Sequence, residues 1–520
     1  MRATSIGHAG MLIETRQGSI LCDPWFEPAF FGSWFVFPRN DRLGDELMAK
    51  IEHPDYLYIS HIHADHLDDV FLRSHISRDT TVLIPGFPTR ELERTLRGYG
   101  FKNILRTHHG KEIELRDGLT VAIHVEVSIS DGPGGDSSIT VFDGETRLLN
   151  QNDCRTHDLD AVAGHGPVDL HWLQYSGAIW YPMVYEETPE RMRELVDAKV
   201  ASQLARALTY VKAIDARYVV PDAGPPCFLD PDLFGVNMIT GDELSIFPDQ
   251  RVFIDVLAKQ WKANGILAIP GTAIDVTPAG MTVTHPMPEA DVERIYTDKA
   301  QYLKEYQADY LPWLEAHKAT WHAPTPDLLE TVRDWWEPLL AMAPTLRSAV
   351  GSNVLLRAGD FEILIDFPNG QVRTYAGEPY RYRFEIQREL VETVVANKAV
   401  DWSNALFLSC RFSAWREGPF NEYVYNFFKS LSVERMRRTE AEAKRKLLPP
   451  SDADEEIQVG DYTIERYCPH RQADLTVFGE LEGCTLTCTL HGWQFDLGNA
   501  GTCLSSSDRP IRVRTSDLAT

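Results

Sequence analysis

The sequence lacks the features that would attach a protein to a membrane or to nucleic acid. In 520 residues, no apolar run approaches the roughly 20 residues that a membrane span requires. Basic residues are outnumbered, with 51 Lys+Arg against 76 Asp+Glu, and the net charge is -25. The phosphate backbone of a nucleic acid repels a protein of this charge. The N-terminus lacks the basic and then apolar segments of a signal peptide. We therefore expect a cytoplasmic protein without a membrane span or a nucleic-acid partner.

Cysteine is also scarce, and its distribution is uneven. Of the eight cysteines, four lie beyond residue 460, and the others stand singly in apolar or turn contexts. A buried thiol is the usual role of such single cysteines. A disulfide framework does not fit this distribution, so the C-terminal group predicts a cofactor site. No internal repeat is visible, and at about 150 residues per domain the length predicts about three domains.

The first group of potential metal ligands follows a short apolar run, 55–59, of the kind that forms a buried strand. It reads Ser60-His61-Ile62-His63-Ala64-Asp65-His66. Along an extended backbone His61 and His63 point to the same side, so both imidazoles can bind one metal. Asp65 and His66 in the following turn can reach a second. The stretch predicts a dinuclear metal site at a strand end.

HxHxDH is the signature of the metallo-β-lactamase superfamily, and segments 6–10 (IGHAG) and 20–26 (ILCDPWF) resemble the first hairpin of that family. The resemblance implies an α/β fold, an αββα sandwich, over residues 1–285. It also implies a metal-bridging carboxylate at the end of a later strand, where this chain has Asp153. A last ligand, a histidine in that family, is implied after strand 218–222, where this chain has Asp222, although Asp222 can equally satisfy the turn before Gly224.

The same resemblance implies one more ligand of the first metal before the bridging aspartate, usually a histidine. Two acids are candidates here. We favour Glu126 because it closes a predicted strand, 119–127, whereas Asp136 can simply cap a turn. His124 shares a strand face with Glu126 and is interpreted as a strand histidine. The predicted metal ligands are His61, His63, Asp65, His66, Glu126, Asp153 and Asp222, with Asp153 and Glu126 as catalytic carboxylates.

Beyond residue 285 the composition changes. Long amphipathic helices are predicted over 289–319 and 326–341, and strand-like segments follow at 354–357 and 361–367. Nothing in this region has metal-ligand spacing. We expect an α+β domain of helices and a sheet over 286–447 that covers the substrate. Segment 448–456 (LPPSDADEE) has the composition of a linker.

The C-terminal segment, 457–520, carries a second cofactor motif. Cys468-Pro469-His470 is followed after seventeen residues by Cys488-Thr489-Leu490-His491. This spacing resembles a Rieske [2Fe-2S] domain, a small all-β unit in which Cys468 and Cys488 would bind one iron and His470 and His491 the other. A Cys₂His₂ zinc finger is the alternative interpretation, but zinc fingers lack CxH at the first ligand pair.

The two cofactor motifs together indicate redox chemistry. A redox cluster has no use in a hydrolase, so iron fits the dinuclear site better than zinc. We expect an O₂-dependent monooxygenase in which a ferredoxin-type donor reduces the Rieske cluster, and the cluster supplies two non-haem irons with electrons. The expected reaction is hydroxylation of an unactivated C–H bond in a small molecule.

Two further resemblances bear on the substrate. Segments 136–138, 150–153, 223–226 and 409–412 resemble the CMP-N-acetylneuraminate hydroxylase family, which implies a nucleotide sugar. The metal chemistry resembles that of di-iron monooxygenases with the metallo-β-lactamase fold in antibiotic biosynthesis, such as the diterpenoid hydroxylase of the platensimycin pathway. That group, which we favour, implies a natural-product acid linked to coenzyme A or to a carrier. A zinc hydrolase and a non-enzymatic electron carrier remain as alternatives.

Overall fold

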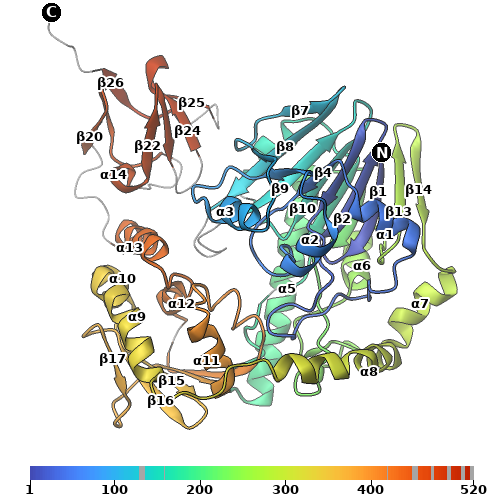
Figure 1. The fold of residues 1–520 in the computed structure, drawn as a ribbon. Coiled ribbons are helices and arrows are strands. Elements are labelled where there is room, and N and C mark those ends of the chain that lie inside the picture. Colours follow the sequence, from blue (N-terminus) through green and yellow to red (C-terminus); the bar gives the residue numbers. More distant parts are fainter. Residues whose placement is uncertain are drawn as a thin grey trace, which may run out of the picture.

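The computed structural model of the chain describes residues 1–127, 135–156, 158–177, 179–418, 420–447, 455–469, 474–488, 493–504 and 510–515. Within these residues the strands form five sheets, and the sheets build three units (Figure 1). The first unit holds the two large sheets, the second a five-stranded sheet, and the third two small C-terminal sheets. No helix in the described residues is both long and apolar enough to cross a bilayer.

The first unit consists of two large sheets that pack face to face. The eight-stranded sheet has the order β14 (Gly280–Thr284), β13 (Ala273–Thr277), β1 (Arg2–Gly7), β2 (Gly10–Thr15), β3 (Gly18–Cys22), β4 (Tyr56–Tyr58), β5 (Thr81–Ile84) and β6 (Ile104–Arg106). The six-stranded sheet has the order β12 (Tyr218–Asp222), β11 (Leu170–Gln174), β10 (Arg147–Asn152), β9 (Asp136–Phe142), β8 (Leu119–Glu126) and β7 (Ile113–Arg116).

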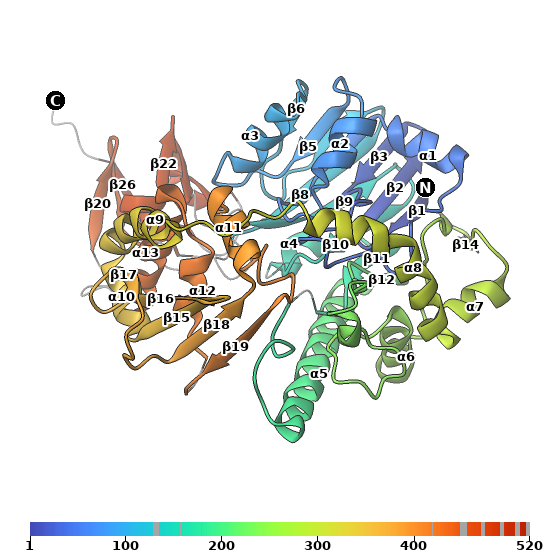
Figure 2. The same cartoon turned by 60° about the horizontal axis from the view of Figure 1, so that its bottom comes forward.

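Alternation along the strands gives each sheet two apolar faces. On β2 and β3, Met11 and Ile20 pack in the core shared with the second sheet, whereas Leu12 and Leu21 pack in the core under the helices. The helices of this unit are α1 (Asp45–Glu52), α2 (Asp69–His75), α3 (Glu91–Gly98), α4 (Leu159–Ala163), α5 (Pro189–Ile214), η2 (Phe234–Val236) and α6 (Gln250–Gln260). The predicted αββα sandwich is confirmed, with α1–α3 outside one sheet and α4–α6 outside the other (Figure 2).

Two helices follow the last strand of the first unit. The helical segment predicted at 289–319 is divided into α7 (Glu289–Thr297) and α8 (Lys299–Lys318). Both pack on the first unit, where Phe35 and Phe37 share a buried cluster with Val292 and Tyr306. Figure 2 shows α8 along this unit, before the chain turns toward the second.

The second unit surrounds the sheet β17 (Gln371–Thr374), β16 (Phe361–Asp366), β15 (Asn353–Ala358), β18 (Tyr382–Ile386) and β19 (Phe412–Arg416). Its helices are α9 (Leu328–Met342), α10 (Pro344–Val350), α11 (Arg388–Ala396), α12 (Glu422–Phe428) and α13 (Val433–Leu447). Trp336 and Trp402 are fully buried in its core. The same cluster continues into the first unit through Trp34 and Trp180, so the two units share an apolar interface.

The third unit comprises two antiparallel sheets, as expected for a small all-β domain. The sheets are β20 (Glu456–Val459), β21 (Tyr462–Glu465) and β26 (Val513–Thr515), and β22 (Gly479–Glu482), β23 (Thr485–Cys488), β24 (Trp493–Asp496) and β25 (Thr502–Cys503); α14 (Leu475–Phe478) and η3 (Leu497–Asn499) complete the unit.

Helix α13 touches all three units (Figure 1). Its Ala441 packs with Cys468 and Cys488 in the core of the third unit. Its Arg435 is bonded to Glu91 of α3 at 2.7 Å and to Asp401 of the second unit at 3.0 Å. Helix α13 therefore packs against the third unit and connects it to the other two.

Candidate metal centre

The histidine-rich loop follows β4 as the sequence predicts, and a buried aspartate holds it in place. Asp23, at the end of β3, accepts a hydrogen bond from the backbone N–H of Ser60 at 2.8 Å. Its other carboxylate oxygen lies 3.0 Å from His66 Nδ1. The loop then closes as a turn, since the N–H groups of His66 and Leu67 donate to the carbonyl of His63. Asp23 thus fixes the direction of an imidazole whose other nitrogen faces the site.

Two histidines and an aspartate form the first candidate ligand group. His61, His63 and Asp153 each offer a ligand atom, and these atoms lie within 4.8 Å of one another. His61 Nε2 is 2.9 Å from His63 Nδ1 and 3.9 Å from Asp153 Oδ2. Asp153 directly follows β10, in the position predicted for a bridging carboxylate. Its other oxygen, Oδ1, is 3.5 Å from His66 Nε2, so this carboxylate lies between His61 and His66.

The second candidate group contains a histidine that the sequence did not single out as a ligand. His8, Asp65 and His66 are all buried, and one ligand atom of each lies within 4.8 Å of the others. His8 stands in the turn between β1 and β2 with a φ of 51°, and its Nε2 is 3.0 Å from Asp65 Oδ2. Its carbonyl accepts a hydrogen bond from the backbone of Ala223. The hairpin and the loop after β12 therefore meet at this group.

The structure brings Asp136, the second of the two acidic candidates, against the histidine loop. Asp136 Oδ1 is 3.3 Å from His61 Nδ1. Strand β9 extends back to Asp136, where the sequence suggested a turn, so Asp136 and Glu126 are paired strand ends. Glu126 is buried, and its charge acts on the imidazole of His109. His124 is a buried residue of β8, with its ring 5.6 Å from that of His109.

Burial and neighbouring charges shift the pKa values of Asp136 and Asp153 in opposite directions. Burial and the adjacent Asp153 raise the pKa of Asp136 to about 6. Burial also acts to raise the pKa of Asp153, but His66 and His61 outweigh it and hold that pKa below its ordinary value. Two carboxyls this close repel each other when both are ionised, and an added positive charge relieves that repulsion.

Several buried polar atoms at this point have no hydrogen-bond partner among the described residues. They belong to both ligand groups and to Asp222, whose pKa burial raises well above its ordinary value. The atoms are Asp65 Oδ1, His66 Nε2, Asp153 Oδ1 and Asp222 Oδ2. An unsatisfied buried polar atom is costly, so their convergence needs a cationic partner. The donor set of imidazoles and carboxylates fits two transition-metal ions.

The predicted ligands of the [2Fe-2S] cluster are partly described. Cys468 and Cys488 are both fully buried in the third unit, and Leu486 and Phe495 are also buried in that core. His470 and His491 lie outside the described residues. The two predicted thiolate ligands therefore lie in the same apolar core.

Comparison with known protein families identifies the domain to which the third unit belongs. Residues 436–513 match the Rieske [2Fe-2S] domain family, which confirms the domain predicted at the C-terminus. Residues 328–445 match a family described as an Rv3818-like, SCP2-like domain. The two matches overlap within α13, the helix that supports the third unit.

Full-length relatives are also similar to the chain. The Rieske 2Fe-2S iron-sulfur protein Rv3818 of Mycobacterium tuberculosis is 43% identical to this chain, over 98% of this chain and 99% of its own length. The cytidine monophosphate-N-acetylneuraminic acid hydroxylase of Danio rerio is 29% identical over 35% of this chain and 30% of its own. This second similarity agrees with the resemblance found in the sequence.

Among solved structures, the metallo-β-lactamase fold protein YhfI of Bacillus subtilis is 13% identical, with a TM-score of 0.34, over 53% of this chain and 99% of its own. The diiron β-hydroxylase CmlA of Streptomyces venezuelae is 14% identical, with a TM-score of 0.35, over 55% of this chain and 54% of its own.

Proposed function

This chain belongs to the family of the Rieske 2Fe-2S iron-sulfur protein Rv3818, and from that membership and the ligand cluster we propose that it is an O₂-dependent monooxygenase with a dinuclear non-haem iron site. The Rieske domain would supply that site with electrons. The expected reaction is hydroxylation of an unactivated C–H bond in a small organic molecule.

The observation that supports this proposal most is the set of buried ligand atoms that lack hydrogen-bond partners among the described residues. Zinc hydrolase sites are dominated by imidazole, whereas this cluster combines imidazoles with several carboxylates. Carboxylate oxygen favours harder, redox-active ions such as iron over zinc. A Rieske domain in the same chain gives those ions a source of single electrons.

We propose the following ligand assignment. His61, His63 and Asp153 hold the first metal. Asp136 lies 3.3 Å from His61 Nδ1, whereas the ring nitrogen that faces His63 and Asp153 is Nε2, so Asp136 is assigned to the orientation of His61, and Glu126 stays the candidate for an acidic ligand. The second metal is held by His8, Asp65 and His66, with Asp153 bridging and Asp222 completing the set. His8 then takes the place of the histidine that the resemblance implies at the position of Asp222. In the third unit Cys468, His470, Cys488 and His491 hold the cluster.

The two irons, when bound, would supply O₂ activation, which no side chain of this chain can supply. The protein's own residues position and insulate the site. Asp23 orients His66 through Nδ1 and thereby directs Nε2 toward the metals. Asp136 and Asp153 provide negative charge that compensates the positive charge of the ions. Trp180 of the first unit and Tyr425 of the second line the cavity beside the site and give it an apolar wall.

Several finer assignments belong to the same proposal. We take residues 1–285 as the dinuclear metal domain, 286–447 as the substrate cover, 448–456 as a linker and 457–520 as the Rieske domain. A ferredoxin-type protein is the proposed electron donor. The sequence resemblance favours a natural-product intermediate as substrate, such as a diterpenoid acid carried on coenzyme A.

Two other functions make different predictions. Similarity to the Danio rerio hydroxylase favours a nucleotide sugar as substrate, with the same metals and electron supply. A zinc-dependent hydrolase would hold two zinc ions and need no reductant. The number of electrons that the protein accepts distinguishes the zinc hydrolase from the nucleotide-sugar hydroxylase.

A reductive titration tests the proposal. Oxidised, iron-loaded protein is titrated anaerobically with dithionite, and the electrons accepted per chain are counted from absorbance and electron paramagnetic resonance. We expect about three electrons, one for the cluster and two for the irons. The double variant H61A/H63A, which keeps the Rieske domain, should accept about one. Equal counts of about one in both proteins would overturn the di-iron assignment in favour of a redox-inert metal.

A further inference from the structure

A cavity of about 410 Å³ lies beside the candidate metal ligands, between the first and second units. His63, Asp65, Asp136 and Asp153 line one end of it. The opposite wall comes from the second unit and from the segment after β11. Its aromatic side chains are Trp180, Tyr181, Phe420 and Tyr425. A molecule bound there would have an apolar surface to pack on and one end near the metals.

The cavity also carries an excess of positive charge away from the metal ligands. Four cationic side chains line it, against the single carboxylate of Glu422; they are Arg155, Lys199, Arg416 and Lys429. Such a concentration is unusual in a protein whose net charge is -25. Arg416 and Lys199 are the two of these four that bear on a ligand, because a charged group in a partly buried position is normally paired and desolvation is costly without a partner.

Arg416, the last residue of β19, is the cation most clearly poised to receive a ligand. Its Nη2 donates to the hydroxyl of Tyr181 at 3.3 Å, and its guanidinium carbon lies 5.1 Å from the ring centre of Tyr185 and 5.8 Å from that of Phe420. Its Nη1 is buried and has no hydrogen-bond partner within the described part of the chain. The aromatic rings hold the guanidinium plane in place, and its free edge is available to an oxyanion.

Lys199, on α5, is a second cation without a carboxylate partner among the residues that the structure describes. It is half-buried, and Arg155 and Arg206 lie close enough for their charges to act on it. Burial, followed by these two arginines, lowers the pKa of Lys199 to about 8. Like charges held together in this way favour a bound anion, which lowers their mutual repulsion.

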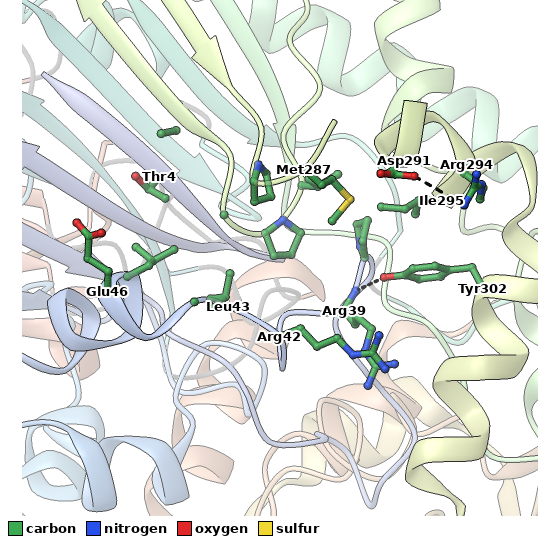
Figure 3. Close-up of a pocket in the computed structure, with 18 of the residues that line it drawn as sticks. Thr4, Arg39, Arg42, Leu43, Glu46, Met287, Asp291, Arg294, Ile295 and Tyr302 are labelled. Carbon is green, nitrogen blue, oxygen red and sulfur yellow. Dashed lines mark hydrogen bonds and ion pairs between the residues drawn. The ribbon is translucent and has the colours of Figure 1, made fainter. Parts of the chain in front are cut away.

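A second and larger cavity, of about 840 Å³, provides a comparison within the same molecule (Figure 3). Its cations are compensated internally. Arg39 pairs with Asp309 at 2.8 Å and its backbone N–H donates to Tyr302, while Arg294 lies 3.7 Å from Asp291. Figure 3 shows both of the latter contacts as dashed lines. The larger cavity therefore has no comparable demand for an anion.

We propose that the cavity beside the metal ligands binds an amphipathic organic anion, whose carboxylate or phosphate pairs with Arg416 in the positive field of Lys199. Its apolar body packs on Trp180 and Phe420, so that the far end reaches the metal ligands. The statement that this far end is the reacting end rests on the proposed function. The anion site itself rests on the cavity and its cations.

Binding of rigid aromatic probes tests this inference. The probes are 2-naphthoate, 2-naphthyl phosphate and the neutral isostere 2-naphthamide, and affinity is measured by calorimetry on the full-length, metal-loaded protein without reductant. We expect one or both anions to bind at least about tenfold more tightly than the amide. Comparison of the two anions shows whether the site prefers a carboxylate or a phosphate. Equal affinity of the amide and both anions would refute the proposal.

Variants locate the anion. R416Q is expected to weaken anion binding about tenfold, and R416K to weaken it less, since lysine keeps the charge but loses the planar fork. R294Q, at the other cavity, is the matched control and should leave the affinity unchanged. The Rieske spectrum and circular dichroism verify folding. Unchanged affinity in R416Q, with binding lost in H61A/H63A, would show metal coordination of the probe and overturn the anion site. Arg416-dependent binding in a protein that fails the reductive titration would retain the anion site while rejecting the proposed oxygenase.

Discussion

Replacement of Lys199 by methionine is expected to stabilise the folded protein. The ammonium is half-buried beside Arg155 and Arg206, and it forms no ion pair with any residue that the structure describes. Its pKa falls from an ordinary value of 10.5 to about 8. This difference corresponds to about 3 kcal/mol of unfavourable charging in the folded state. Because the side chain keeps some contact with solvent, we expect K199M to raise the free energy of unfolding by about 1–2 kcal/mol at pH 7.

The stability difference between K199M and the wild type should depend on pH, and the direction of the pKa shift fixes how. The pKa of Lys199 is lower in the folded state, so the charged lysine costs its full amount below pH 8. That cost disappears as the pH rises from about 8 toward the unfolded value of 10.5. The stability difference between K199M and the wild type should therefore be largest at pH 7 and shrink steadily up to pH 10.

Urea denaturation of both proteins at pH 7, 8, 9 and 10 measures this difference. K212M, which removes an exposed lysine from the same helix, is the matched control and should change stability by less than about 0.5 kcal/mol at every pH. A K199M protein less stable than the wild type at pH 7, or a difference that grows with pH, would refute the account of an uncompensated cation in the cavity.

Other predictions concern the unit interface and the metal ligands. R435A removes a side chain only 4% exposed from two ion pairs, and it should lower the free energy of unfolding by about 3 kcal/mol in urea denaturation; R94A, which removes an exposed pair, should cost less than about 1 kcal/mol. H8A should lose about one of the two metals outside the cluster, as counted by plasma mass spectrometry, and full retention of both would exclude His8 as a ligand. D136A, which removes the carboxylate beside His61 Nδ1, should weaken metal binding about tenfold in a chelator competition, and unchanged affinity would exclude a role of Asp136 in orienting His61.

The sequence predicts those parts of the site that are local in the chain. The strand β4 and the loop from Ser60 to His66 can be predicted because six residues contain four ligands in a fixed spacing. Asp153 could be placed because it ends a strand of clear apolar character. The Rieske motif is equally local, and its spacing alone identifies it.

The remaining parts of the site depend on contacts between distant segments. His8 reaches Asp65 only because the β1–β2 hairpin folds over the loop, and nothing in the local sequence distinguishes it from a turn histidine. The sequence feature that could have identified His8 is its place beside Gly7, in the segment that resembles the first hairpin of the family. Asp136 is the less favoured acidic candidate in the sequence because its segment also allows a turn, and the length of β9 depends on pairing with β8. The cationic cavity combines Lys199 and Arg416 from different units, so only the tertiary fold shows it.

Metal and sulfide content of anaerobically purified protein, combined with electron paramagnetic resonance after dithionite reduction, tests the central claim most directly. The account predicts about four irons and two inorganic sulfides per chain, with the signal of a reduced Rieske cluster. About two irons with two zinc ions, and no gain of redox capacity after the zinc is replaced by iron, would contradict it and indicate a zinc hydrolase that carries a Rieske domain.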